Sequence, residues 1–313
     1  LWLNKYLSWR EQQLKLLLNV FLSFKNRLMD LEKILPKSGP PINEVSKYIE
    51  KYKNELIVIK YGGNVFIDRG IFNNFISDLN LLNKIGLSVV VIHGGGPRIK
   101  RELDKSNIES KFLRGLRITD EKIIKIVERV LIDFNDDIVS SLNKIGTQAI
   151  SIHTQKNNII EVNPEEEELG FVGIPNKIDI DIIKRIVEKN IIPIISPLGL
   201  GKKKQTYNIN GDTAAGAIAK SLKSRRLLLM TNVRGVLDKE KKLIEEISSS
   251  EILEMIKNGT ITEGMIPKIN TCLDAVNNGV TAVGIIDGRE KHSILFEIFS
   301  DKGSGTLIRK WKN

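Results

Sequence analysis

The chain has 313 residues, of which 41% are hydrophobic and 27% charged, a composition typical of a globular protein with a sizeable core. The formal net charge is +10, but the lysines are scattered and accompany no nucleic-acid motif, so we expect no nucleic-acid partner. No apolar run approaches the roughly 18 residues of a membrane-spanning helix, so we expect no membrane partner. Cys272 is the only cysteine and the three histidines lack metal-ligand spacing, which excludes disulfides, predicts no metal site and favours a cytoplasmic location.

Residues 1–41 are predicted to be an N-terminal helical extension followed by a linker. Over residues 4–35, apolar side chains recur at helical spacing with charges between them, as in an amphipathic helix. Three prolines and a glycine within residues 36–41 end this helix. A second short helix is predicted at residues 42–53. The two helices either cover part of the core or form an oligomerisation arm, because an apolar face must be buried.

From residue 56 onward, apolar runs alternate with helical patterns. Seven runs predict strands, at residues 56–60, 89–93, 149–153, 191–196, 227–231, 280–287 and 306–309. Several of them are almost wholly apolar, as expected for strands covered on both faces of a parallel sheet. Helical patterns fill the gaps, for example at residues 120–144 and 212–221. The chain is therefore predicted to have an α/β fold with an open, mainly parallel central sheet sandwiched by helices.

Two glycine clusters stand directly after predicted strands. The first is Lys-Tyr-Gly-Gly-Asn at residues 60–64, and the second is His-Gly-Gly-Gly-Pro at residues 93–97, where a helix begins. Glycine lets backbone amides approach an anion closely, and a helix N-terminus adds favourable partial charge. Two tight turns without a ligand are the alternative. The pair nevertheless favours a phosphate cradle, and neither cluster has the spacing of a P-loop or a dinucleotide fingerprint.

Several polar residues further along the chain suit anion chemistry. Arg117 offers a planar fork that matches a carboxylate. Asn208, Asn210 and Asp212 occupy alternate positions and can face one side, although Asp212 could instead be a plain helix N-cap. Lys268 is predicted just inside a helix start, where the helix dipole disfavours a cation. It therefore points to a nearby anion, with a solvated surface lysine as the alternative.

Two other polar positions are interpreted as structural. Thr119 or Asp120 is expected to cap the helix that follows. His93 stands at the end of a predicted strand, and we interpret it as a structural residue rather than a general base.

The motifs together resemble those of the amino-acid kinase family, and within it those of the acetylglutamate kinases. The resemblance covers residues 43–310 and rests on KYGGN (60–64), HGGGP (93–97), GLRITD (115–120), GFVG (170–173), YNINGDTAAGAIA (207–219) and EGMIPK (263–268). It implies that ATP phosphorylates the side-chain carboxylate of N-acetyl-L-glutamate, the second step of L-arginine biosynthesis, with Mg²⁺ bound to the nucleotide. It also implies an N-terminal acetylglutamate-binding lobe near residues 55–200 and a C-terminal ATP-binding lobe near residues 201–313, within a kinase domain spanning residues 42–313.

The resemblance also implies roles for individual residues. Lys60 and Lys268 would neutralise charge on the transferring phosphoryl group, and Asp212 would orient both lysines. Arg117 and Asn208 would hold the α-carboxylate and the acetamido group. The surrounding backbone amides would come from Gly62, Gly63, Gly94, Gly95 and Gly96, and residues 229–237 would form part of the nucleotide pocket. Such a carboxylate acceptor is already ionised at neutral pH, so no general base is needed.

Arginine-inhibited members of the family resemble this chain in having a helix before the first strand, which interlaces dimers into a hexamer. Residues 42–53 match that helix. Near the C-terminus, residues 297–303 resemble the arginine-binding stretch, which makes Glu297 and Gly303 candidate contacts of L-arginine as a feedback inhibitor. For Glu297, an exposed position on the last helix is the alternative.

Two other functions stay open. One is a related kinase that acts on UMP or glutamate, against which GLRITD and YNINGD argue. The other is a catalytically silent arginine sensor, which would have no chemical need for Lys60, Asp212 and Lys268 together.

Overall fold

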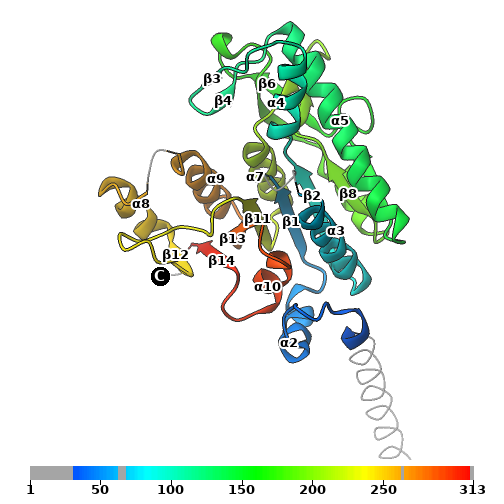
Figure 1. The fold of residues 1–313 in the computed structure, drawn as a ribbon, viewed down its shortest axis with the longest axis vertical. Coiled ribbons are helices and arrows are strands. Elements are labelled where there is room, and N and C mark those ends of the chain that lie inside the picture. The colour runs from blue at the N-terminus through cyan, green and yellow to red at the C-terminus, as the bar shows by residue number, and fades with distance from the viewer. Residues whose placement is uncertain (1–30, 63–67, 262–263, 311–313) are drawn as a thin grey trace, which may run out of the picture.

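The computed structural model describes residues 31–62, 68–261 and 264–310 (Figure 1). Its centre is an eight-stranded sheet with the order β12-β14-β13-β11-β1-β2-β8-β5, in which every pairing is parallel except that of β13 with β14. The strands are β1 (Leu56–Tyr61), β2 (Ser88–His93), β5 (Ala149–Ile152), β8 (Ile192–Ile195), β11 (Arg226–Thr231), β12 (Glu246–Ser248), β13 (Ala282–Asp287) and β14 (Gly305–Arg309). All seven predicted strands are present, with ends shifted by two residues at most.

Both faces of the central sheet are buried, which explains why the strands read as continuous apolar runs. Along β1, Ile57 and Ile59 pack into one hydrophobic cluster, whereas Val58 between them packs into another. The first cluster includes residues of α2 (Ile42–Tyr52), α3 (Arg69–Lys84), α10 (Ser293–Phe299) and the C-terminal half of α5 (Glu121–Lys144). The second includes residues of α6 (Ile180–Val187), α7 (Gly211–Leu222), α8 (Ser249–Lys257) and α9 (Ile266–Asn277). The predicted α/β sandwich is confirmed.

Two smaller sheets lie beside the central one and were not predicted. The strands β6 (Ile160–Pro164), β7 (Gly173–Ile178), β9 (Leu198–Leu200) and β10 (Thr206–Asn208) form a sheet with the order β10-β9-β6-β7. The hairpin of β3 (Phe112–Leu113) and β4 (Leu116–Arg117) lies near α4 (Gly96–Lys105), at the end of the molecule opposite α2 (Figure 1). The strands β3, β4, β9 and β10 have only two or three residues each, and exposed positions interrupt β6 and β7, so none of them forms an apolar run like those of the central sheet.

The helix boundaries confirm one capping prediction and correct another. The Asp120 side chain accepts hydrogen bonds from the backbone N–H groups of Lys122 and Ile123, so it is the N-cap of α5. By contrast, Asp212 is not an N-cap. Asn210 takes that place in α7, because its backbone is extended and its Oδ1 accepts from the Asp212 and Thr213 N–H groups. The Asp212 carboxylate is thereby left for other partners.

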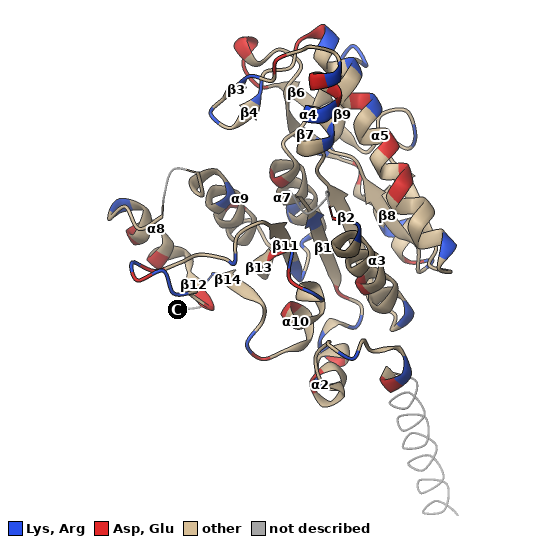
Figure 2. Cartoon of the chain, in the orientation of Figure 1, with Lys and Arg blue, Asp and Glu red and all other residues tan. Residues whose placement is uncertain are grey.

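At the N-terminus, the helix predicted at residues 42–53 is confirmed as α2. The helix predicted at residues 4–35 lies, up to residue 30, outside the described residues. Within the described ranges, no helix is both long enough and apolar enough to cross a membrane. Lys and Arg alternate with Asp and Glu along the outer helices of this part of the chain, without forming a continuous basic stripe (Figure 2).

The buried clusters predict a large difference between two leucine-to-alanine variants. Leu79 of α3 is fully buried, so Leu79→Ala leaves a cavity and should lower the free energy of unfolding by about 2–5 kcal/mol. Leu253 of α8 is 51% exposed, so Leu253→Ala is a matched control with an effect of about 0.5 kcal/mol or less. Urea denaturation followed by circular dichroism measures both. Equal shifts of the two midpoints would contradict this packing.

Candidate active site

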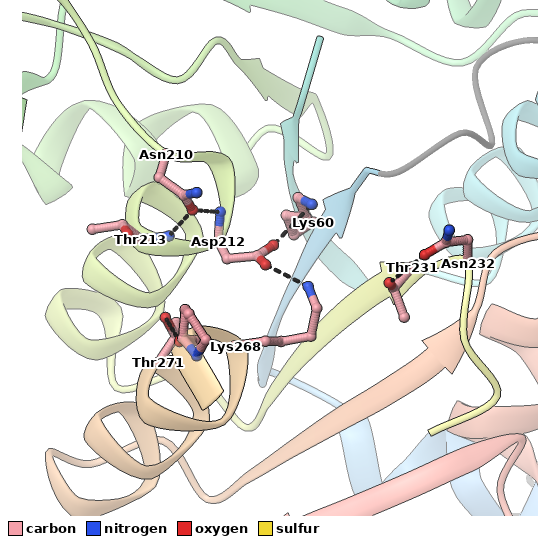
Figure 3. Close-up of polar contacts among 9 residues, drawn as sticks. Lys60, Asn210, Asp212, Thr213, Thr231, Asn232, Lys268 and Thr271 are labelled. Atoms are coloured by element: carbon pink, nitrogen blue, oxygen red, sulfur yellow. Dashed lines mark hydrogen bonds and ion pairs between the residues drawn. The ribbon is translucent and has the colours of Figure 1, made fainter. Parts of the chain in front are cut away.

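Three charged side chains from distant parts of the sequence meet at the carboxyl end of the central sheet (Figure 3). Lys60 lies near the end of β1, Asp212 in the first turn of α7 and Lys268 in the first turn of α9. The Lys60 ammonium nitrogen lies 2.8 Å from Oδ1 of Asp212, and the Lys268 ammonium group pairs with Oδ2. The three predicted catalytic residues therefore form one cluster, which we call the Lys–Asp–Lys cluster.

The Lys–Asp–Lys cluster is shielded from water, since its side chains are only 10–16% exposed. Burial by itself raises the pKa of the Asp212 carboxyl, but the two ammonium groups outweigh it and hold this pKa below its usual range. Burial, reinforced by the charge of Lys268, lowers the pKa of the Lys60 ammonium against the opposing pull of Asp212. With two lysines and one carboxylate, the cluster carries a net positive charge that suits an additional anion.

The glycines of the two predicted cradles leave space that side chains would fill. A Cβ atom on Gly62 would lie 1.8 Å from Nζ of Lys60, so glycine keeps the path of that ammonium group open. A Cβ atom on Gly95 would lie 2.4 Å from a methyl group of Leu131. Gly95 is the N-cap residue of α4 and Gly96 its first residue, so backbone N–H groups at this helix start are free to meet an anion. Gly63 lies outside the described residues.

A cavity of about 240 Å³ opens beside the Lys–Asp–Lys cluster. It brings together most of the catalytic and substrate-binding residues predicted from the sequence, namely Lys60, Gly94, Gly95, Gly96, Arg117, Asn208 and Asp212. Gly62 and Lys268 do not line it. The cavity also has an apolar part that includes Phe112, Leu116 and Val172. We call it the acceptor cavity.

Arg117 is a buried cation without a full set of partners. Its side chain is 9% exposed, and its one hydrogen bond among the described residues, from Nη2 to the Gly96 carbonyl, is 3.5 Å long. Nη1 is buried and has no partner in the described part of the chain. Burial lowers the pKa of the guanidinium, and the Phe112 ring lies 4.7 Å from its central carbon. Because unmatched buried donors are costly, the site favours an incoming carboxylate.

His93 takes no part in the Lys–Asp–Lys cluster. Its ring is fully buried, with Nε2 3.1 Å from the Ser196 hydroxyl and 3.2 Å from the Asn135 amide nitrogen. Burial lowers the pKa of His93 to about 4, so the imidazole is neutral at physiological pH. These contacts agree with its interpretation as a structural residue.

A second cavity, of about 480 Å³, lies between the loop after β11 and the end of α8. Its walls combine apolar side chains, among them Val236, Leu237, Ile261 and Met265, with polar groups such as Asp238 and Asn258. The prediction of a nucleotide pocket at residues 229–237 covers only part of this wall. Residues 258–261 were missed, because nothing in their local sequence indicates that they face the β11 loop. We call this space the nucleotide cavity, after the role that is proposed for it below.

A third cavity, of about 140 Å³, lies between α2, α10 and the segment that follows α10. Glu297 and Gly303, the candidate effector contacts, both line it. Glu297 is 7% exposed and accepts a 2.9 Å hydrogen bond from the Ser304 N–H, so its alternative reading as an exposed residue is wrong. Burial raises the pKa of its carboxyl group. We call this space the α2–α10 cavity.

Comparisons with known proteins agree with this architecture. An acetylglutamate kinase of Pelagibacter ubique (strain HTCC1062) is 53% identical over 281 residues, which span 90% of this chain and 98% of the relative. An acetylglutamate kinase of Clostridioides difficile (strain 630) is 44% identical over 85% of this chain and 95% of its own.

Solved structures with low sequence identity show the same fold. The N-acetylglutamate synthase of Neisseria gonorrhoeae has a TM-score of 0.79 at 23% identity, over 87% of this chain, which spans 63% of that protein. The carbamate kinase of Giardia lamblia bound to AMP-PNP has a TM-score of 0.61 at 18% identity, over 82% of this chain and 99% of that one. Residues 55–287 match the amino acid kinase family. This chain belongs to the amino acid kinase family.

Proposed function

We propose that this protein transfers the γ-phosphoryl group of ATP to the side-chain carboxylate of N-acetyl-L-glutamate, forming N-acetyl-L-glutamyl 5-phosphate for L-arginine biosynthesis. One observation carries the proposal: the Lys–Asp–Lys cluster adjoins a cavity that Arg117 lines with an unmatched, buried guanidinium. A substrate with two carboxylates can meet both positive regions at once. The acetylglutamate kinases that are 41–53% identical to this chain support the choice of substrate.

In the proposed complex, the acceptor lies in the acceptor cavity. The fork of Arg117 binds the α-carboxylate in a bidentate manner, which supplies its missing hydrogen-bond partners. Asn208, whose amide donates only a 3.5 Å hydrogen bond to Thr119, binds the acetamido group. The side-chain carboxylate then points towards Lys60 and the glycine amides at the start of α4.

The proposed chemistry depends on positioning and electrostatic stabilisation. The acceptor carboxylate is ionised at neutral pH and attacks without a general base, in agreement with the neutral, fully bonded state of His93. Lys60 approaches the phosphoryl group from the acceptor side and Lys268 from the nucleotide side. Asp212 holds both ammonium groups in place. Two fixed cations stabilise charge on the transferring oxygens more effectively than water, because they need no reorganisation during the reaction.

The nucleotide is proposed to occupy the nucleotide cavity, with its phosphates directed towards Lys268. Mg²⁺ would bind together with the nucleotide, through the phosphate oxygens, and would neutralise part of their charge. Asp212 is the carboxylate that lines the neighbouring acceptor cavity, and both of its oxygens are paired with lysines. This donor set fits a metal ion held mainly by the nucleotide. Within the described ranges, no group of three or more His, Cys, Asp or Glu side chains could hold a metal ion.

We retain the predicted lobes as part of the proposal. The acceptor lobe spans residues 55–200 approximately, and the nucleotide lobe spans residues 201–313 approximately, within a kinase domain of residues 42–313. In support, much of the acceptor cavity wall lies between residues 60 and 197, whereas the nucleotide cavity wall lies between residues 233 and 265.

The α2–α10 cavity is proposed to bind L-arginine as a feedback inhibitor. Its walls carry both signs of charge, with Glu245, Glu246, Glu297 and Asp301 facing Lys51, Arg226, Lys302 and Arg309. This mixture suits an amino acid that has an α-carboxylate, an α-ammonium group and a guanidinium group. Assembly into dimers, and into hexamers through the N-terminal helices, stays a prediction, as does a cytoplasmic location.

The activity is tested by trapping the acyl phosphate with hydroxylamine in the presence of ATP and Mg²⁺. N-acetyl-L-glutamate should give hydroxamate, whereas L-glutamate should not, and UMP should not stimulate ADP release. Turnover of UMP or glutamate instead would assign the chain to a kinase with another acceptor. Absence of turnover with every acceptor, in a folded protein, would favour the silent arginine sensor.

Two substitutions should separate acceptor binding from catalysis. Arg117→Lys loses the bidentate fork and should raise KM for N-acetyl-L-glutamate by about tenfold or more, with a smaller change in kcat. Lys60→Met removes a cation that acts on the transferring group and should lower kcat by about 100- to 1,000-fold. Steady-state kinetics measure both. Arg129→Lys, on an Arg whose side chain is 58% exposed, is the matched control and should resemble wild type. A purely kcat effect of Arg117→Lys would argue against its proposed role.

Arginine inhibition should depend on the buried carboxylate of the α2–α10 cavity. Glu297→Gln removes one negative charge facing the effector, so the arginine concentration for half-maximal inhibition should rise by about tenfold or more. Initial rates at increasing arginine concentrations measure this. Glu254→Gln on the exposed face of α8 is the matched control. If saturating arginine leaves the wild-type rate unchanged, the regulatory proposal is wrong.

A further inference from the structure

Two helices carry the two partners of one catalytic ion pair. Asp212 belongs to α7 and Lys268 to α9, two helices that are not consecutive in the chain. The helices lie side by side (Figure 1), and both begin at the carboxyl end of the sheet. The place of Lys268 relative to Asp212 is therefore determined by how α9 packs along α7.

The contact between the helices continues in register beyond the ion pair. Residues 212, 216 and 220 follow one another by one turn on the same side of α7. Opposite them on α9 lie residues 268, 271 and 274. Lys268 pairs with Asp212, Thr271 lies against Gly216, and Asp274 pairs with Lys220. The first and last contacts have opposite polarity, so sliding α9 by one turn would break both ion pairs.

The middle contact is the closest one. A Cβ atom on Gly216 would lie 2.8 Å from Cγ2 of Thr271, well inside the 3.5–4.0 Å or so at which two carbon atoms pack best. A threonine in a helix has two accessible rotamers, and the one present here directs the methyl group of Thr271 towards Gly216. Its hydroxyl also donates a 3.2 Å hydrogen bond to the Pro267 carbonyl, one turn earlier and next to Lys268 (Figure 3). A Cβ atom on Gly216 therefore forces Thr271 either to break this hydrogen bond by changing rotamer or to move together with the backbone of α9.

We propose that Gly216 and Thr271 are positioning residues for the phosphoryl transfer, because their contact sets the register and spacing of α9 and thereby holds Lys268 against Asp212. Neither residue touches the reacting groups. The inference rests on the proposed function for its kinetic consequence, but its structural consequence is independent of any substrate. The exposed Lys220–Asp274 pair supports the same register, although such pairs contribute little stability.

The test is a double-mutant cycle in the full-length protein. Gly216→Ala should lower kcat by about tenfold or more, because a displacement of about 1 Å in a catalytic group can cost up to about 100-fold. KM for N-acetyl-L-glutamate should change less than kcat, since no described residue of α9 lines the acceptor cavity. Thr271→Ser removes the clashing methyl group and keeps the hydroxyl. The variant that combines Gly216→Ala with Thr271→Ser should recover kcat to within about threefold of wild type.

Thermal denaturation separates positioning from general damage. Alanine has a higher helix propensity than glycine, so a register effect predicts reduced kcat without a matching loss of Tm. Ser221→Ala, at an exposed position in the last turn of α7, raises helix propensity without contacting α9 and is the matched control. A kcat of Gly216→Ala within twofold of wild type, or no recovery in the double variant, would overturn the proposal.

A second readout stays valid even if wild type does not phosphorylate N-acetyl-L-glutamate. Crystal structures of the substrate-free wild type and Gly216→Ala variant should show a longer distance from Nζ of Lys268 to the Asp212 carboxylate in the variant. The double variant should restore it. An unchanged distance would reject the positioning role. Inactive wild type with a lengthened distance in the variant would reject the proposed function alone.

Discussion

The arrangement of this protein depends on one buried carboxylate shared by two lysines. Asp212 is held between Lys60 and Lys268, each of which comes from a different element of the fold. A lysine buried alone would lose its proton or draw in water, and a carboxylate buried alone would take up a proton. Together they stabilise one another's charges although their side chains are only 10–16% exposed. The charged cluster therefore forms only when three segments of the chain pack together in the right geometry. The surrounding hydrophobic contacts hold these segments in place.

The central sheet supplies the rigid side of this arrangement. Because β1 is buried on both faces and paired with β2 and β11, Lys60 is presented from the most constrained part of the molecule. Asp212 and Lys268 come from helix starts, which pack on one face of that sheet. Helix packing against a sheet tolerates small shifts more readily than strand pairing does. The contact of α7 with α9 is consequently the place where catalytic geometry is most open to change.

The acceptor cavity and the α2–α10 cavity both contain buried charges that are incompletely balanced. The Lys–Asp–Lys cluster has one positive charge too many, Arg117 has a buried guanidinium nitrogen without a partner, and Glu297 is a buried carboxylate near the cationic side chains of the α2–α10 cavity. Each is costly in the free protein and less costly once a ligand of opposite charge arrives. Under the proposed function, the protein gives up some stability so that the anionic substrates, and the proposed amino-acid effector, bind where their charge is needed.

The sequence by itself determined the parts of this protein that depend on local pattern. Apolar runs identified seven of the eight strands of the central sheet and missed only β12, and the position before a periodic stretch narrowed the cap of α5 to Thr119 or Asp120. Lys60, Asp212 and Lys268 stood out through motifs, although the possibility that Asp212 was an N-cap was excluded only when Asn210 proved to hold that place. Tertiary structure alone decided the burial of Glu297, the short strands beside the central sheet and the part of the nucleotide cavity wall at residues 258–261. Helix and strand periodicity arises from neighbours a few residues apart, whereas these features arise from contacts between segments far apart in the chain, which leave no periodic trace.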